Sequence, residues 1–404
     1  MSRNENGTPR RMKAINKKRI LNCIQENSPI SRAEIAAKAK ISKPTVSLLV
    51  DELLKENWIV EKGIGEASSQ GGRRPIQLYF NNEAAYVIGV DIGGTKVKTV
   101  ICDLTGNIIQ SSSFTTGQYL ETGLVRQIAI EVNHLIQSGE IEGEKVLGMG
   151  VGVPGITDAE SGVVVEAPSL NWVRYPFMAE IKKHFDFPIF LENDVNIAAL
   201  GEQWLGNAQH KENMLFIAVG TGIGSGIIIH NQLYRGTSNA AGEMGYMVTD
   251  KNEIQSEFTP VFHRYGYLES VAGGKAIGDR FTKAVRELTG HPLHKHAAEK
   301  ELSGESAFQY AIKGDKTAEK VVSEAIEHLA YGLINAACLL NPEAIILGGG
   351  VLKSHEYILP RLRKIMNPYL PSSVELKISR LGDNAGVLGA VALFLREHES
   401  IMKT

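Results

Sequence analysis

Two stretches of the sequence decide the fold: VIGVDIGGTKVKTVICD, residues 87–103, and LFIAVGTGIGSGIIIHNQLYRG, residues 215–236. In each stretch, two segments rich in β-branched residues flank a short run of glycines, which predicts a strand, a tight turn and a second strand. The two turns lie about 130 residues apart. Two copies of one hairpin at this distance predict two related lobes that face a common cleft.

The glycines of the two turns indicate a binding site for phosphate groups. Glycine lets the backbone approach a ligand closely and lets successive amides point at phosphate oxygens. Neither cluster opens directly into a helix, so the turns match neither a Walker A loop nor a dinucleotide-binding fingerprint. A structural turn is the alternative for one hairpin alone. A third glycine run, residues 348–350, fits either an approach to adenine or ribose or a tight strand-to-helix turn.

Polar residues cluster between and after the hairpins, and turns at 152–155 and 167–172 are expected at strand ends. Asn193 and Asp194 separate an apolar strand from an Ala-rich helix, where the aspartate could serve only as a helix cap. The pair could also bind a polyhydroxyl ligand, and Asp194 would then accept the proton of the attacking hydroxyl in a phosphoryl transfer. Glu243 and Glu269 suit sugar hydroxyls, with a surface charge as the alternative.

Charge is divided unequally along the chain of 404 residues. The net charge is −2, yet residues 1–80 contain fifteen basic and eight acidic side chains, and the rest is acidic. A basic head indicates contact with a polyanion, although a solvated basic tail would give the same balance. No apolar run reaches the about 20 residues of a membrane-spanning helix, and the N-terminal residues lack the apolar core expected of a secretory signal. Three widely separated cysteines fit a reducing cytoplasm.

The basic head has the pattern of a helix-turn-helix, with an ordinary three-helix bundle as the alternative. Apolar residues at helical spacing predict a helix over residues 14–26. A capping box formed by Ser31 and Glu34 opens a second helix, and Ser42 can cap a third, with Pro44 in its first turn. The third helix carries a continuous apolar stripe formed by Val46, Leu49, Val50, Leu53 and Leu54.

Candidate DNA contacts lie at the start of the third helix and on a predicted wing. Short hydroxyls and a cation beside a helix N-terminus suit phosphates and base edges in a major groove. Residues 58–60 and 76–80 predict two strands whose loop ends in adjacent arginines, which can enter a minor groove or clamp phosphates. These features predict a winged helix. The predicted DNA-binding residues are Ser42, Lys43, Thr45, Ser47, Arg73 and Arg74.

With these motifs in this order, the sequence resembles the ROK family of sugar kinases and sugar-responsive repressors. The resemblance rests on DIGGTK at 91–96, ENDVNIAALGE at 192–202, GTGIGSG at 220–226 and GEMGYM at 242–247. The N-terminal extension is similar to that of the repressor branch, which includes xylose-operon repressors. The resemblance implies an α/β protein with a winged helix-turn-helix over 1–82 and a two-lobed actin-like ATPase fold. Its lobes would span 83–200 and 201–404, with the last helix returning to the first lobe.

The resemblance also implies roles for individual residues. The implied nucleotide-binding residues are Asp91, Gly93, Gly94, Thr95, Lys96, Thr221, Gly222, Gly224 and Gly349. The implied sugar-binding residues are Asn193, Asp194, Glu243, Tyr246 and Glu269. In a kinase of this family, Asp194 would be the catalytic base.

Two departures from the family pattern concern zinc. Family members usually carry a histidine where this chain has Tyr246, and three cysteines before the second glutamate, where residues 250–269 contain none. His263 alone cannot supply the four ligands of a closed zinc site. We therefore expect no structural zinc and no other metal site. Packing should hold this loop instead, with Phe258, Phe262, Tyr265 and Tyr267 as candidates.

These observations predict a cytoplasmic repressor of a carbohydrate-utilisation operon, dimeric or tetrameric, without membrane contact. Its partners would be operator DNA and a small sugar inducer such as xylose or glucose. Sugar would favour a lobe arrangement that spaces two winged helices wrongly for the operator half-sites. Repression would require no cofactor. Because DIGGTK and Asp194 are intact, the alternative is an ATP- and Mg²⁺-dependent sugar kinase that carries a DNA-binding domain.

Overall fold

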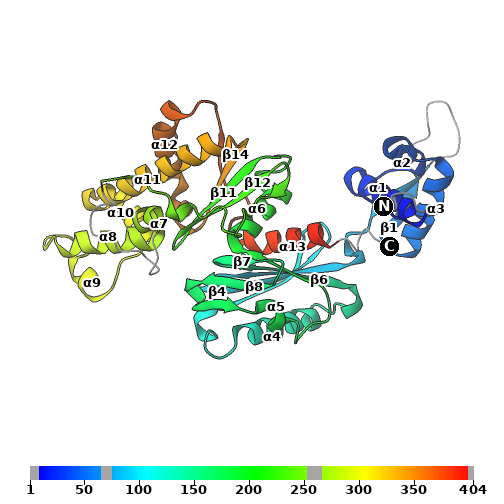
Figure 1. Ribbon diagram of the computed structural model, residues 1–404, viewed down its shortest axis with the longest axis horizontal. Helices are drawn as coiled ribbons and strands as arrows, with labels where there is room; N and C mark the ends of the chain where they lie inside the picture. The colour runs from blue at the N-terminus through cyan, green and yellow to red at the C-terminus, as the bar shows by residue number, and fades with distance from the viewer. Residues whose placement is uncertain (1–8, 65–74, 253–265, 399–404) are drawn as a thin grey trace, which may run out of the picture.

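The computed structural model describes residues 9–64, 75–252 and 266–398. Its N-terminal part consists of α1 (Pro9–Asn27), α2 (Arg32–Ala39) and α3 (Lys43–Lys55), followed by the antiparallel strands β1 (Ile59–Ile64) and β2 (Ile76–Phe80). We call this part the winged-helix domain (Figure 1). The combination of three helices and a hairpin confirms the predicted winged helix.

Local sequence signals account for the helix boundaries of the winged-helix domain. Glu34 Oε2 accepts from the Ser31 amide at 2.9 Å, and the Ser31 hydroxyl accepts from the Glu34 amide, which completes the predicted capping box. Ser42 caps α3, with Pro44 in the first turn as predicted. The first helix starts at Pro9 rather than at residue 14. Proline is favoured in a first helical turn, and residues 10–13, between Pro9 and the predicted start, contain no helix breaker.

The first large sheet has the strand order β10-β6-β3-β4-β5. Its strands are β3 (Tyr86–Ile92), β4 (Lys96–Asp103), β5 (Ile108–Thr115), β6 (Val146–Val153) and β10 (Ile189–Asn193). The first three form an antiparallel meander, whereas β6 runs parallel to β3 and β10 runs parallel to β6. The DIGGTK motif is the turn between β3 and β4, as predicted.

The second large sheet repeats this topology with the order β13-β12-β11-β14-β15. Its strands are β11 (Met214–Val219), β12 (Ile223–Ile229), β13 (Gln232–Leu233), β14 (Ala344–Gly348) and β15 (Glu375–Ile378). The first three are again antiparallel, and β14 and β15 again add in parallel. The GTGIGSG motif is the turn between β11 and β12. The two glycine motifs therefore occupy equivalent positions in two sheets of equal topology.

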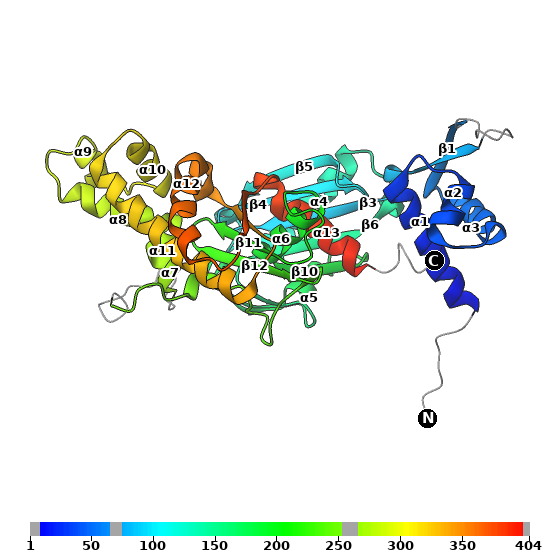
Figure 2. The same ribbon diagram turned by 90° about the horizontal axis from the view of Figure 1, so that it is seen from above.

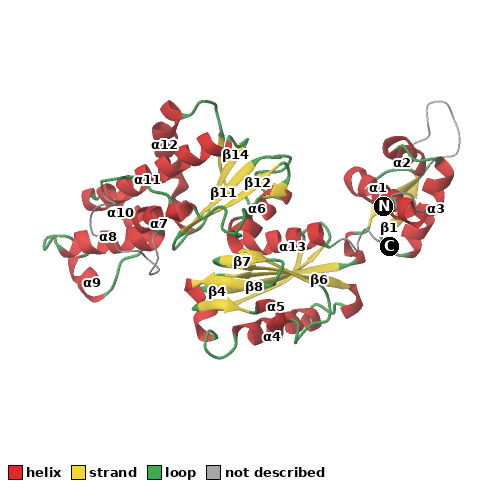
Figure 3. Ribbon diagram, in the orientation of Figure 1, coloured by secondary structure: helices red, strands yellow, loops and turns green. Residues whose placement is uncertain are grey.

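Smaller elements complete each half of the body. On the first sheet pack α4 (Leu124–Ser138) and α5 (Phe177–Ile181), and beside it lies a three-stranded sheet of β7 (Ile156–Asp158), β8 (Val163–Ala167) and β9 (Trp172–Tyr175). We call these elements the first lobe. The second lobe comprises the second sheet and the helices α7 (Tyr267–Ala272), α8 (Gly274–Arg286), α9 (His294–Glu299), α10 (Gly304–Ile312), α11 (Lys316–Leu340) and α12 (His355–Met366). Helices α8 to α10 and the winged-helix domain lie at opposite ends of the molecule (Figures 2 and 3).

Two helices cross between the lobes. Helix α6 (Asp194–Trp204) follows β10 of the first sheet and packs on β11 and β12 of the second, whereas α13 (Ala385–Glu397) follows β15 of the second sheet and packs on β3 and β6 of the first. At their crossing, any side chain at Gly389 would collide with the carbonyl oxygen of Ile197. Helix α13 ends toward the winged-helix domain (Figure 1). A change in the angle between the lobes must therefore displace these two helices.

Side chains of the winged-helix domain pack directly on the body. Trp58 and Phe80 belong to the core of the winged helix and also pack on the cluster that contains Val387, Val391 and Phe394 of α13. The backbone amide of Leu104 donates to the carbonyl of Asn82 at 3.1 Å across the junction. Within the described ranges, no helix combines the length and the apolar character needed to cross a membrane.

Candidate functional site

A cavity of about 520 Å³ is lined by residues of both lobes. The first lobe and the start of α6 contribute Gly94, Thr95, Pro154, Gly155, Ile156, Glu166, Pro168, Ser169, Asn193, Asp194 and Val195. The second lobe contributes Ala218, Gly220, Thr221, Gly222, Ile223, Gly224, Glu243, Tyr246 and Glu269. All five residues expected to bind sugar and five of the nine expected to bind nucleotide line this one cavity.

The turn between β10 and α6 separates the roles of Asn193 and Asp194. The side-chain oxygen of Asn193 accepts from the amides of Val195 and Asn196, at 2.9 and 3.0 Å, and so caps the helix. The Asn193 amide nitrogen donates to the carbonyl of Gly155 at 2.9 Å. Because Asn193 serves as the cap, Asp194 occupies the first helical position, where its carboxyl lines the cavity. Asn193 is therefore the N-cap residue, and the Asp194 carboxyl also accepts from the Val195 amide at 2.9 Å.

Four carboxyl groups in and beside the cavity are harder to ionise than usual. Burial raises the pKa of Asp194 to about 7, and the negative charges of Asp91 and Glu243 add to the rise. Burial also raises the pKa of Asp91 to about 6, although Lys96 and Lys98 oppose the shift. The pKa values of Glu243 and Glu269 are raised, again mainly by burial. Hydrogen bonds from hydroxyl groups stabilise the ionised form of such buried carboxyls, and a neutral polyhydroxyl ligand supplies these donors.

The other residues expected at the nucleotide site flank the cavity. The Asp91 carboxyl lies against Gly386 in the first turn of α13, and the Gly93 amide closes the β3–β4 turn by donating to the Lys96 carbonyl at 2.9 Å. Lys96 forms an ion pair with Asp383 at 3.5 Å, in the segment before α13. Gly349, with φ of 91°, lies against the backbone of Val219 at the end of β11. These four do not line the cavity, so their role in nucleotide binding stays a prediction.

Sequence reasoning missed two polar residues of the cavity wall, Glu166 and Ser169. The turn at 167–172 was expected to gather ligand-facing groups, but no individual residue of it was singled out. Ser169 lies across from the first glycine turn, since a side chain at Gly94 would contact its Cβ at 3.0 Å. Glu166 belongs to β8, where a single charged residue in an apolar strand looks like an ordinary solvent-facing position.

One histidine of α11, His328, contacts both Thr249 and Tyr267. The Thr249 hydroxyl lies 2.8 Å from His328 Nδ1, and the buried Tyr267 ring meets the His328 ring edge-on at 5.8 Å between centroids. Tyr267 therefore packs as expected, whereas Phe258, Phe262, His263 and Tyr265 lie outside the described residues. Among the residues that the structure does describe, no group of three or more His, Cys, Asp or Glu side chains could hold a metal ion. His328 lies in no sequence motif, so its contacts could not have been predicted from the sequence.

The predicted DNA-contacting face begins at the N-terminus of α3. Lys43 is exposed, while the hydroxyls of Ser42 and Thr45 lie 2.7 Å apart and bond to each other. Leu48, which the sequence analysis did not single out, is 58% exposed on the same helix and presents an apolar group there. Arg73 and Arg74 of the predicted wing lie outside the described residues.

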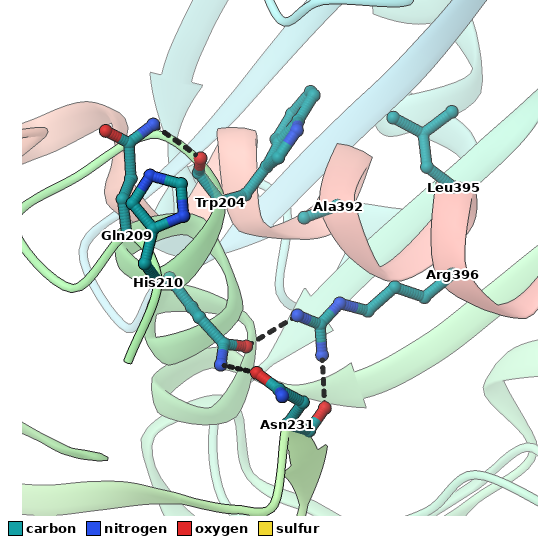
Figure 4. A pocket seen from close by; sticks show the side chains of 8 residues that line it. Trp204, Gln209, His210, Asn231, Ala392, Leu395 and Arg396 are labelled. Carbon is teal, nitrogen blue, oxygen red and sulfur yellow. Dashed lines mark hydrogen bonds between the residues drawn. The ribbon is translucent and has the colours of Figure 1, made fainter. Parts of the chain in front are cut away.

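A second cavity, of about 400 Å³, lies at the end of α6 and is lined by no residue of the predicted sites. Figure 4 shows that its polar groups bond to one another. Arg396 donates to the Gln203 side-chain oxygen at 2.5 Å and to the Asn231 carbonyl at 3.2 Å. Gln203 in turn donates to the Asn231 side chain at 3.0 Å. These bonds tie the last turn of α13 to the last turn of α6 and to the β12–β13 turn.

Family models match most of the chain. One described as ROK family matches residues 87–397, and one described as winged helix-turn-helix DNA-binding matches residues 14–60. The chain is 31% identical over 392 residues to a xylose repressor of Caldicellulosiruptor bescii, and the alignment covers 96% of each protein.

Solved structures show the same architecture. A ROK family transcriptional regulator, a homologue of the E. coli MLC protein, matches 97% of this chain and 98% of its own, with a TM-score of 0.80 at 23% identity. A ROK family glucokinase from Streptomyces griseus, solved with glucose and AMPPNP, matches 76% of this chain and 99% of its own, with a TM-score of 0.66 at 28% identity. With this fold, and a family model that extends over most of its length, the chain belongs to the ROK family.

Proposed function

We propose that the protein is a sugar-responsive transcriptional repressor of a carbohydrate-utilisation operon. One observation carries this proposal: a single chain joins a winged helix to a cavity rich in carboxyl groups between two lobes. Helix α6 begins at this cavity, and α13 belongs to the cluster on which the winged helix packs. The similarity to a xylose repressor over 96% of both proteins supports it and makes a pentose or hexose the first candidate effector.

The positions of the carboxyl groups suggest how a sugar would act. Asp194 approaches the cavity from the first-lobe side, and Glu243 and Glu269 approach it from the second lobe. A sugar that donates hydroxyls to both sides would hold the lobes together in one arrangement. Because α6 and α13 lie between the lobes and α13 packs near Trp58 and Phe80, that arrangement would reposition the winged helix. Sugar would then weaken DNA binding by its differential affinity for the two arrangements.

Operator binding tests the proposal directly. A labelled duplex from the promoter that the protein controls would be titrated with the full chain by fluorescence anisotropy, with and without D-xylose or D-glucose. We expect the sugar to weaken binding by about tenfold or more, within the usual range of allosteric coupling. Binding should also fall steeply with salt, since phosphate contacts release counterions. An operator affinity that no sugar changes would refute the proposal.

Two finer points belong to the same proposal. Paired operator half-sites call for a twofold-symmetric assembly, so we expect a dimer or a tetramer of dimers, which analytical ultracentrifugation can distinguish. We also place the protein in the cytoplasm, where operator DNA is accessible, and expect repression to need no cofactor and no zinc.

One specific observation favours a second activity, ATP-dependent phosphorylation of the sugar. Asp194 has a pKa of about 7 and lines the same cavity as Thr95 and Thr221 of the two glycine turns. A general base works best when its pKa lies near the operating pH. The two turns would hold the phosphates of ATP, and Asp194 would accept the proton of the sugar hydroxyl. Incubation with ATP, Mg²⁺ and a panel of hexoses and pentoses tests this activity, and sugar binding without any turnover would exclude it.

A further inference from the structure

One guanidinium group joins three parts of the body. Arg235 follows β13 in the second lobe, and its side chain is 31% exposed. Its Nε lies 2.6 Å from Oε2 of Glu192 in β10 of the first lobe. Its Nη2 lies 3.6 Å from Oε1 of Glu397, the last residue of α13. Neither glutamate nor Arg235 lines the sugar cavity, so none of the three is expected to touch the ligand.

The ion pair with Glu192 connects Arg235 to the turn that carries Asp194. Glu192 is buried, with 2% of its side chain exposed, and its Oε1 accepts from the Asn193 amide at 2.9 Å and from the Asn196 side chain at 3.0 Å. Asn193 caps α6 and thereby sets the position of Asp194 at the first helical residue. Removing Arg235 would leave a buried carboxylate without its cation, which is strongly unfavourable. The turn would then rearrange on the first-lobe side of the cavity.

The backbone of Arg235 fixes the opposite wall of the cavity. Its carbonyl accepts from the Ala241 amide at 3.0 Å, which closes the loop that leads to Glu243. The next residue, Gly242, is held by Ser225 of β12, whose amide and hydroxyl donate to its carbonyl at 2.9 and 2.8 Å. Arg235 therefore holds the segment that carries Glu243 and, through Glu192, the turn that carries Asp194.

The Glu397 arm reaches the end of α13. The neighbouring Arg396 already binds this end to Gln203 of α6 and to the β12–β13 turn (Figure 4). One turn earlier, Phe394 belongs to the cluster on which Trp58 and Phe80 of the winged-helix domain pack. The Arg235–Glu397 pair is half-exposed on both sides, so its ion pair is weak and can form or break at little free-energy difference.

We propose that Arg235 is a positioning residue that aligns Asp194 and Glu243 for the sugar and, through Glu397, links occupancy of the cavity to α13 and the winged helix. The proposal rests on the proposed function and deepens it. The buried arm to Glu192 governs the geometry of the sugar site. The half-exposed ion pair with Glu397 governs how strongly sugar binding changes the operator affinity.

Four variants of the full chain, one of them a control, test separately the ion pairs of Arg235 with Glu192 and with Glu397. Each would be measured for sugar affinity by calorimetry with D-xylose or D-glucose, whichever raises the melting temperature of the unmodified protein. Each would also be measured for operator affinity with and without saturating sugar. In Glu397→Gln, the sugar affinity and the sugar-free operator affinity should stay within about twofold of those of the unmodified protein. The ratio of operator affinity without sugar to that at saturating sugar should fall by about two- to fivefold. Glu324→Gln, which breaks the comparably exposed Arg280–Glu324 pair far from α13, is the matched control and should change neither.

Substitutions at Arg235 test the other arm. Arg235→Gln should weaken sugar binding by about tenfold or more, because the buried Glu192 loses its cation. Arg235→Lys should restore most of the sugar affinity, but it should not restore the ratio of the operator affinities without and with sugar. A single ammonium cannot bind both carboxylates as the forked guanidinium does. A merely structural role would lower the melting temperature of all Arg235 variants without this split between the two affinities.

Two outcomes would overturn the proposal. One is a ratio of sugar-free to sugar-saturated operator affinity that Glu397→Gln leaves unchanged. The other is a change of this ratio in Glu324→Gln as large as that in Glu397→Gln. If the unmodified protein bound a sugar without releasing DNA, the proposed function would fail. The sugar affinities of Arg235→Gln and Arg235→Lys would then still decide whether Arg235 positions the site. Equal sugar affinities for these two variants and the unmodified protein would refute that role as well.

Discussion

Sugar binding should strengthen as the pH rises through about 7, because an ionised Asp194 accepts a sugar hydroxyl more strongly than a protonated one. Burial and two neighbouring carboxyl groups raise the pKa of Asp194 to about 7 in the sugar-free protein. A hydroxyl that donates to a carboxylate favours the charged form and lowers its pKa. Binding must therefore release a proton wherever Asp194 is protonated in the free protein and ionised in the complex.

The size of the effect follows from this pKa. About one molecule in eleven has Asp194 ionised at about pH 6, and about ten in eleven have it ionised at about pH 8. If the sugar binds only the ionised form, its affinity rises about tenfold between these two pH values, or about 1.4 kcal/mol. Asp91, whose pKa is raised to about 6, does not line the cavity, so its protonation acts on the site through Asp194, whose pKa it lowers.

Titration calorimetry in two buffers of different ionisation enthalpy measures both consequences. We expect release of nearly one proton per sugar at about pH 6 and of almost none above about pH 8. Asp194→Asn should bind the sugar more weakly but with a nearly flat profile over this range, because the titrating group is gone. An affinity that is equal at the two pH values, or higher at the lower one, would show that the ionised Asp194 is not the acceptor.

Three further predictions concern stability and DNA binding. In the sugar-free protein the pKa of Asp194 is raised from 3.8 to about 7, so the free energy of unfolding should fall as pH rises from about 4 to about 7. Asp194→Asn should accordingly raise it by about 1–3 kcal/mol at about pH 8 in urea titrations, and a lower value would contradict the assignment. Gly389→Ala should destabilise the protein by about 1–3 kcal/mol, because a methyl group collides with Ile197 where α6 and α13 cross, whereas Gly117→Ala, in open space, should stay within about 0.5 kcal/mol. Lys43→Ala should weaken operator binding and reduce the slope of affinity against salt by about 1, while the sugar affinity stays the same; an unchanged slope would remove Lys43 from the phosphate contacts.

Local sequence signals predicted the elements of this fold well. The capping box at Ser31, the cap at Ser42 and the two glycine turns depend on interactions within a few residues, which the sequence displays directly. The cluster of Asn193, Asp194, Glu243 and Glu269 in one cavity was implied by the family resemblance. No local pattern could have brought these residues together, since they belong to different lobes.

Long-range packing accounts for what the sequence could not predict. Helices α6 and α13 exchange sheets because small residues at their crossing allow close contact, and a small residue alone does not identify its partner. Lys96 pairs with Asp383 from a segment nearly 290 residues away, which no local pattern indicates, and its expected contact with the phosphates stays a prediction. Arg235 and His328 act through contacts with elements distant in sequence, and neither lies in a motif.

The most direct measurement of the central claim is the sugar affinity of the protein free in solution and saturated with operator duplex. Linkage requires that DNA weaken sugar binding by the same factor by which sugar weakens DNA binding. We predict an affinity about tenfold or more lower on the operator than in solution. Equal sugar affinities in the two states would show that the cavity and the winged helix are not coupled.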